Sequence, residues 1–160
     1  MTFTDFKKII TTFKERSLPG RKLYIWRGSK EKILDYLPTD IVRELDVLQI
    51  APQGVIDERA QIQKGIKKAI AQKLEEYILN LQVQQILVVS NIHLLARYKV
   101  SLVSFYEIYF SDKTLVILIV PMEKVDTQLP AYVSFEDDFT LKYLKEVLSE
   151  EHKFNIIEEV

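Results

Sequence analysis

The fold is indicated first by the stretch Gln85–Ser90, which reads QILVVS. Its consecutive apolar residues do not alternate with polar ones, which is typical of a strand covered on both faces. A second run of this kind follows at Thr114–Pro121, with the sequence TLVILIVP. Strands covered on both faces belong mainly to parallel sheets, whose connections lay helices over the faces. The two runs therefore predict an α/β protein with a mostly parallel sheet.

The segments around these runs alternate between helical and extended patterns. Helices are expected at residues 3–16, 30–37, 57–81, 92–110 and 138–149, and further strands at residues 22–26, 46–50 and 132–135. Strands that alternate with helices form βαβ units. The sequence therefore predicts a three-layer sandwich whose sheet has about five strands.

The length of 160 residues predicts one domain with one core. We expect an N-terminal helix at residues 3–16, an α/β core at residues 20–135, and a C-terminal helix and tail at residues 136–160. The chain has no cysteine and two histidines, which argues against disulfides, a Cys nucleophile and a metal centre. No apolar run approaches the length of about 20 residues that is needed to cross a bilayer, and no export signal is visible. A cytoplasmic location without membrane contact is therefore expected.

In open α/β sheets, ligands bind outside the carboxyl ends of the strands. A site is therefore expected at residues 27–30, 51–54, 90–91 and 121–124. The residues of a phosphate or nucleotide site would be Arg27, Gly28, Ser29, Lys30, Ser90 and Asn91.

Each of these residues also has an ordinary structural interpretation. Arg27 and Lys30 either grip a phosphate or are solvated charges beside a turn. Asn91 either lines the same site or caps a helix that begins at Ile92. His93 either titrates near neutral pH or is a surface or hydrogen-bonded histidine.

The order of these features resembles the core of P-loop NTPases, particularly the AAA+ group. The resemblance covers roughly residues 20–135. In that group the first strand leads into the phosphate loop, a later strand carries the metal-binding acids, and the next strand carries a polar sensor residue. The resemblance implies a P-loop-like fold for this chain.

Both catalytic motifs of that group are degraded here. A phosphate loop has the form G-x-x-x-x-G-K-[ST], in which successive backbone N–H groups wrap the phosphates. The junction Trp26–Lys32 has one glycine, and its Ser and Lys stand in the wrong order. Ser90 and Asn91 occupy the place of the acids, and an amide cannot act as a general base. We therefore expect no ATP hydrolysis, no catalytic residue and no required cofactor, with ATP and Mg²⁺ as the alternative. The other interpretation is a different α/β fold in which Gly28 makes a turn.

A closer resemblance rests on three blocks, which are residues 86–98, Phe105-Tyr106 and residues 114–121. They look like the BrxF-type accessory proteins of BREX bacteriophage-defence systems. This resemblance implies a cytoplasmic accessory subunit that acts with larger ATPase and methyltransferase partners.

Charge is distributed unevenly along the chain. The formal net charge is −1, but residues 1–80 carry a net +4 and residues 81–160 a net −5. The strongest basic run is residues 7–32, with a net charge of +7. The candidate contacts with a partner or nucleic acid are Lys7, Lys8, Lys14, Arg16, Arg21, Lys22, Arg97 and Lys99. Such a run either follows a phosphate backbone or meets a complementary face on a partner protein or a second copy.

Three functions are consistent with these observations. The first is a non-catalytic P-loop-like interaction or regulatory subunit of a phage-defence complex. The second is a nucleotide-binding protein with weak NTPase activity, and the third is a nucleic-acid-binding accessory module.

Overall fold

The structure of the 160-residue chain is a computed structural model, and it describes residues 1–16, 22–50, 59–78, 84–102, 105, 113–121, 137–148 and 155–158. The elements in chain order are α1 (Phe3–Glu15), β1 (Leu23–Arg27), α2 (Lys30–Tyr36), β2 (Val42–Asp46), α3 (Val47–Ile50), α4 (Arg59–Ile78), β3 (Gln85–Ser90), α5 (His93–Arg97), β4 (Thr114–Ile119), α7 (Asp137–Val147) and β5 (Ile156–Glu158).

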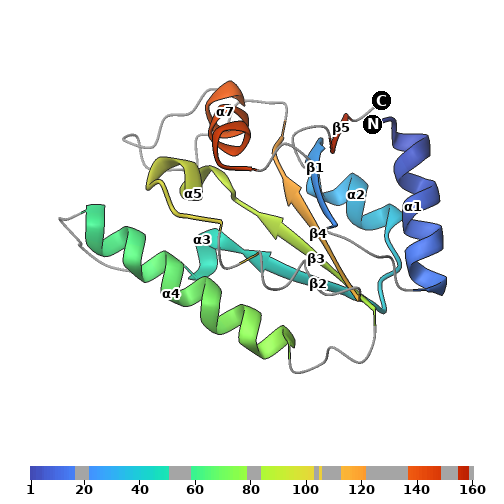
Figure 1. The fold of residues 1–160 in the computed structure, drawn as a ribbon, viewed down its shortest axis with the longest axis horizontal. Coiled ribbons are helices and arrows are strands. Elements are labelled where there is room, and N and C mark those ends of the chain that lie inside the picture. Colours follow the sequence, from blue (N-terminus) through green and yellow to red (C-terminus); the bar gives the residue numbers. More distant parts are fainter. Residues whose placement is uncertain are drawn as a thin grey trace.

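The described strands form one parallel sheet in the order β2-β3-β4-β1-β5 (Figure 1). The predicted three-layer α/β architecture with a parallel sheet is confirmed. The two apolar runs of the sequence are β3 and β4, and every residue of both strands is buried. Their central position in the sheet explains why neither strand alternates between apolar and polar residues.

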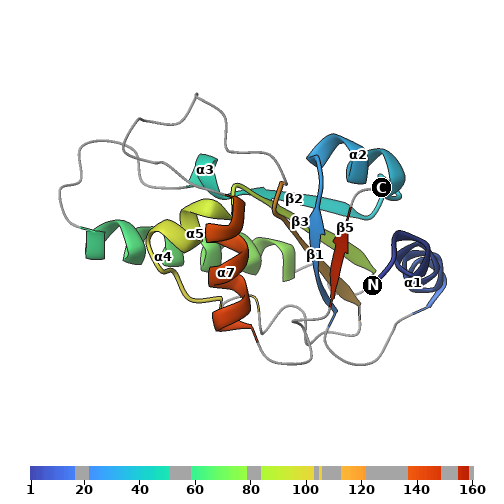
Figure 2. The same ribbon diagram turned by 90° about the horizontal axis from the view of Figure 1, so that it is seen from above.

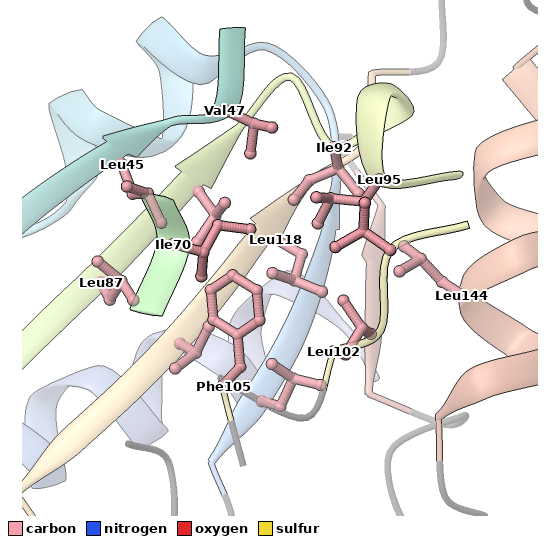
Figure 3. Close-up of a cluster of buried hydrophobic side chains, with 14 of the residues drawn as sticks. Leu45, Val47, Ile70, Leu87, Ile92, Leu95, Leu102, Phe105, Leu118 and Leu144 are labelled. Carbon is pink, nitrogen blue, oxygen red and sulfur yellow. The ribbon is translucent and has the colours of Figure 1, made fainter. Parts of the chain in front are cut away.

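Helices cover both faces of the sheet (Figure 2). On one face, α1 and α2 pack against Tyr24 and Trp26 of β1. On the other face, α4, α5 and α7 pack against Leu23 and Ile25 of the same strand. Figure 3 shows part of this second layer, where Ile70 of α4 lies near side chains from several strands and helices.

The first helix begins at a capping box. The Thr2 hydroxyl accepts a hydrogen bond from the Asp5 backbone N–H at 3.1 Å, and the Asp5 carboxylate accepts one from the Thr2 N–H at 3.4 Å. Phe6, Ile10 and Phe13 then recur at helical spacing and are buried against the sheet. The predicted opening helix is confirmed.

The second strand differs from the prediction. β2 is Val42–Asp46, and residues 47–50, predicted to be extended, form the short helix α3. The Asp46 carboxylate accepts a hydrogen bond from the Leu48 backbone N–H at 2.9 Å, which helps to turn the chain from the strand into the helix. Because β2 is an edge strand with exposed Arg43 and Glu44, it lacks the apolar run that marks β3.

The structure adds a strand in the segment that was predicted to be a tail. The predicted strand at residues 132–135 falls outside the described residues. β5 lies at Ile156–Glu158, in the segment predicted as a tail, and pairs in parallel with β1. The sheet therefore extends beyond residue 135, where we expected the α/β core to end.

The helix predicted at residues 92–110 is interrupted after α5: residues 98–102 are not helical, Phe105 is helical again, and residues 103–104 and 106–110 fall outside the described residues. α5 stops at Arg97, and Lys99 has a positive φ of 51°. The Val100 N–H donates to the Leu95 carbonyl at 2.8 Å and the Lys99 N–H to the Ala96 carbonyl at 3.3 Å. These two bonds form a Schellman motif, with Lys99 in the left-handed position that terminates a helix.

The path of the chain creates a switch point at β1. The connection after β1 runs through α2 on one face to the far edge strand β2. The chain then returns strand by strand to β4, with α4 and α5 on the opposite face. α7, which precedes β5, covers that same opposite face. The connections therefore change face between β1 and β4, and the adjoining carboxyl edge is where α/β sheets bind ligands.

Candidate functional site

The carboxyl edge of the sheet holds most of the predicted site residues. Arg27 ends β1 and Ser90 ends β3, with β4 between these two strands. Asp46 ends β2 and is the register partner of Ser90. The predicted segments 51–54 and 122–124 fall outside the described residues.

The connection between β1 and α2 consists of two residues, Gly28 and Ser29. The Ser29 hydroxyl accepts a hydrogen bond from the Lys32 N–H at 3.3 Å and so caps α2. The Ser29 carbonyl accepts a hydrogen bond from the Trp26 indole N–H at 2.9 Å. A phosphate loop needs a longer run of glycine-containing backbone to surround its ligand. This tight turn is therefore organised by its own hydrogen bonds and has no room for such a cradle.

Lys30 forms an ion pair with a neighbouring strand. Its ammonium nitrogen lies 2.9 Å from Oε1 of Glu44 on β2. This hydrogen bond raises the pKa of Lys30, and the charges of Glu44, Asp46 and Glu31 act in the same direction. The structure thus places the predicted phosphate-gripping lysine against a carboxylate.

Asn91 joins the ends of β2 and β3. Its side-chain Nδ2 donates a hydrogen bond to Oδ1 of Asp46 at 2.6 Å. Asn91 has a φ of 58°, a left-handed conformation that Asn tolerates better than most residues. The prediction that its side chain caps a helix starting at Ile92 is wrong. The N-cap of α5 is Ile92, which makes no side-chain capping bond, and the Asn91 side-chain nitrogen donates to Asp46.

His93 lies beside this pair and is buried, with 7% of its surface exposed. Burial lowers its pKa from 6.5 to about 4, while the negative charge of Asp46 acts in the opposite direction. At neutral pH the imidazole is therefore uncharged. Of the two structural alternatives, a surface position is excluded.

Arg27 is a buried charged residue at this edge. Side chains alternate along a strand, so Arg27 projects towards the face of Ile25, opposite to the face that α2 and Lys30 cover. Arg27 is 6% exposed, and its Nη1 has no hydrogen-bond partner among the described residues. The structure therefore does not bring Arg27 and Lys30 together as a phosphate clamp.

The predicted contact residues divide between the two faces. Lys7, Lys8, Lys14 and Arg16 are exposed on or beside α1, whereas Arg97 and Lys99 belong to α5 and its end, on the opposite face. They therefore do not form one surface.

One residue of the basic run is buried, and another falls outside the described residues. Lys22 is 3% exposed, so its assignment as a surface contact is wrong. Its position next to the central strand β1 accounts for this burial. Arg21 falls outside the described residues.

Sequence reasoning missed Asp46 and Glu44. Asp46 was expected to open a strand, but it closes one and precedes a helix, the position that Asp favours as an N-cap. That preference was the available signal. No local sequence signal marked Glu44, because its ion pair with Lys30 depends on how β2 and α2 are placed in space.

The described residues contain neither a cluster of metal ligands nor a membrane-spanning helix. No three side chains of His, Cys, Asp or Glu converge there as metal ligands. None of the helices in these described ranges combines the length and apolar composition needed to cross a membrane.

Comparison with the models of known protein families finds no match, and no curated protein is significantly similar to the chain.

Proposed function

We propose that this chain is a non-catalytic, P-loop-like subunit that acts by binding other macromolecules. The observation that carries the proposal lies at the turn after β1, on the carboxyl edge of the sheet. We call this edge closed because the side chains at this turn are bonded within the chain. Ser29 caps α2 and bonds to Trp26, and Lys30 is paired with Glu44. The groups that would meet a nucleotide in a P-loop protein instead bond to other residues of the chain.

The position after β3 supports the same function. A P-loop NTPase needs a carboxylate there to hold the metal and another to activate water. Asn91 stands at that position, and its amide bonds to Asp46. An amide does not take up a proton from water, so this residue cannot serve as the general base.

The strand order supports the P-loop-like part of the proposal. In P-loop NTPases the first strand, the acid-bearing strand and the sensor strand contribute to one site. The corresponding strands here are β1, β3 and β4, and they are neighbours in the order β3-β4-β1. The same geometry with altered residues is consistent with a fold of this type that has lost its chemistry.

The resemblance to BrxF-type proteins suggests the setting of this function. On that basis the chain is a cytoplasmic accessory subunit of a phage-defence complex. Its partners would be protein subunits such as a large ATPase or a methyltransferase, or a second copy of the chain.

Thermal unfolding with nucleotide tests the proposal. We expect millimolar ATP with Mg²⁺ to leave the Tm unchanged and to yield no released phosphate, because only a ligand that binds the folded state raises the Tm. Differential scanning fluorimetry and a phosphate-release assay measure the two quantities. A rise of several degrees that Lys30→Ala abolishes and Lys32→Ala preserves would overturn the non-catalytic, nucleotide-free function.

Arg27 favours a second function, the binding of a nucleotide or another phosphate. No ion pair joins the buried Arg27 guanidinium to a described residue, and a buried charge without a partner is costly, so an anion from solution would offset that cost. Arg27 lies at the carboxyl end of β1, beside the switch point. This second function uses Arg27 rather than Lys30 as the phosphate contact.

Replacement of this arginine distinguishes the two functions. Arg27→Met should stabilise the ligand-free chain by about 1 to 3 kcal/mol in urea unfolding, because it removes a buried charge and retains most of the apolar volume. Arg43→Met, at an exposed position on β2, serves as the control and should change stability little.

Phosphate provides the second arm of this experiment. If phosphate raises the Tm of the wild type and not that of Arg27→Met, the second function is supported. An unchanged Tm favours the first function. Destabilisation by Arg27→Met would contradict the view that the buried guanidinium lacks a stabilising partner.

A further inference from the structure

The most uniform positive surface of the described chain lies on α4, outside the basic run of residues 7–32. Residues 59–74 contain five basic side chains and no acidic one, and the first acids of the helix are Glu75 and Glu76. Near that end, Lys73 forms an ion pair with Glu76 at 3.4 Å. Among the described residues, no ion pair reaches the lysines in the first part of the helix.

Burial fixes which side of α4 faces solvent. Ile66, Ile70 and Leu74 recur every four residues and are buried in the core beneath the helix. The side chains of Lys64, Lys67 and Lys68 are exposed. These three lysines are neighbours on the helix surface, because residues three and four positions apart lie on adjacent turns.

Nothing on α4 neutralises these lysines. The positions three and four residues away from each of them hold other lysines, glutamine, glycine, alanine or isoleucine. No ion pair joins any of the three to a described residue. Adjacent like charges cost helix stability, so the chain maintains this cluster against a local penalty.

A second element extends the cluster. The Gln63 side-chain amide donates a hydrogen bond to the Lys99 carbonyl at 2.8 Å, which holds the end of α5 against α4. Lys99 is exposed and is fixed in its left-handed conformation by the Schellman motif. We call the surface formed by Lys64, Lys67, Lys68 and Lys99 the α4 basic face.

The α1 surface is less suited to an anionic partner. Its lysines are interspersed with Asp5 and Glu15. The Lys7 ammonium lies 4.7 Å from the centre of the Phe3 ring and 5.4 Å from that of Tyr36. This cation–π contact engages part of the positive charge of α1 within the chain.

We propose that the α4 basic face binds the phosphate backbone of a nucleic-acid duplex. Phosphate contacts are made chiefly by Lys and Arg with help from polar side chains, and the exposed Gln61 and Gln72 accompany the lysines on α4. A protein partner is less well matched, because protein interfaces depend on apolar and aromatic anchors. Among the described residues, the exposed large hydrophobic side chains are Met1 and Leu48, and neither lies on α4.

Fluorescence anisotropy with a labelled duplex DNA of about 20 base pairs tests this proposal, because the slope of log K against log salt counts the phosphates neutralised. The full-length chain should bind at low salt and lose affinity steeply as salt is added. The triple variant K64Q/K67Q/K68Q should bind more weakly and should reduce the slope by about 3, one for each lost phosphate contact.

The control removes the same charge from the other face of the molecule. The variant K7Q/K8Q/K14Q on α1 should retain most of the affinity and nearly the whole slope. Equal losses in the two variants would show attraction to overall charge and overturn the assignment to α4. Binding to polyglutamate with no binding to duplex DNA would identify an acidic protein as the partner and also overturn it.

The experiment is independent of the nucleotide test. A chain that does not bind ATP can bind duplex DNA through α4, and a chain that binds ATP can lack DNA binding. Circular dichroism and the Tm of both triple variants verify that the substitutions leave the fold intact, as expected for exposed side chains.

Discussion

Acidification from pH 7 to pH 4 is expected to destabilise the folded chain by about 3 kcal/mol through one buried histidine. Burial lowers the pKa of His93 from 6.5 to about 4. In the unfolded chain the imidazole takes up a proton near its ordinary pKa, whereas the folded chain resists protonation until the pH approaches 4. The contribution of the neutral His93 to the free energy of unfolding is therefore fully present above pH 6.5. It is lost progressively as the pH falls towards 4.

Urea unfolding at a series of pH values measures this loss. His93→Leu removes the titrating group, so the difference in unfolding free energy between wild type and variant should change by about 3 kcal/mol across this window. Carboxylates that titrate in the same range affect both chains alike and cancel in the difference. A difference that does not depend on pH would contradict the burial of a neutral imidazole.

The second histidine provides the matched control. His152 lies outside the described residues. His152→Leu should leave the steep loss of stability below pH 6.5 in place. If it removes that loss and His93→Leu does not, the responsible group is His152.

The parts of the fold that the sequence predicted are those with local signals. β3 and β4 were predicted because both are buried on two faces and consist of apolar residues. β2 was misplaced because an edge strand with exposed polar side chains gives no such run. β5 has three residues, too few for any period to show, and its pairing with β1 joins segments about 130 residues apart.

The candidate site also has some features that the local sequence predicts and others that depend on how distant segments pair. The short turn after β1 follows from the single glycine in the local sequence, and the degraded phosphate loop could therefore be predicted. The Asn91–Asp46 bond joins residues 45 positions apart and depends on strand pairing. The basic run of residues 7–32 was misleading as a surface, because net charge along the sequence does not reveal that Lys22 is buried.

Among the single substitutions considered, the largest loss of stability is expected at Trp26. Its side chain is 1% exposed, its ring lies 5.4 Å from that of Phe3, and its indole N–H bonds to the Ser29 carbonyl. Trp26→Ala should cost about 3 to 5 kcal/mol in urea unfolding, because it leaves a cavity between α1 and the sheet. A loss below about 2 kcal/mol would show that the surrounding side chains can close over the site.

Trp26→Phe separates the packing of this residue from its hydrogen bond. Phe retains an aromatic ring beside Phe3 but cannot donate to the Ser29 carbonyl, so we expect a loss clearly smaller than that of Trp26→Ala. The same variant tests why the carboxyl edge is closed, because Trp26 holds the two-residue turn on which the proposed function rests. If Trp26→Phe gains a Tm response to ATP with Mg²⁺ that the wild type lacks, this hydrogen bond keeps nucleotide out. If neither chain responds to ATP, the hydrogen bond from Trp26 to Ser29 is not what keeps nucleotide out, and the Ser29 cap, the Lys30–Glu44 ion pair and the short turn remain as the explanation.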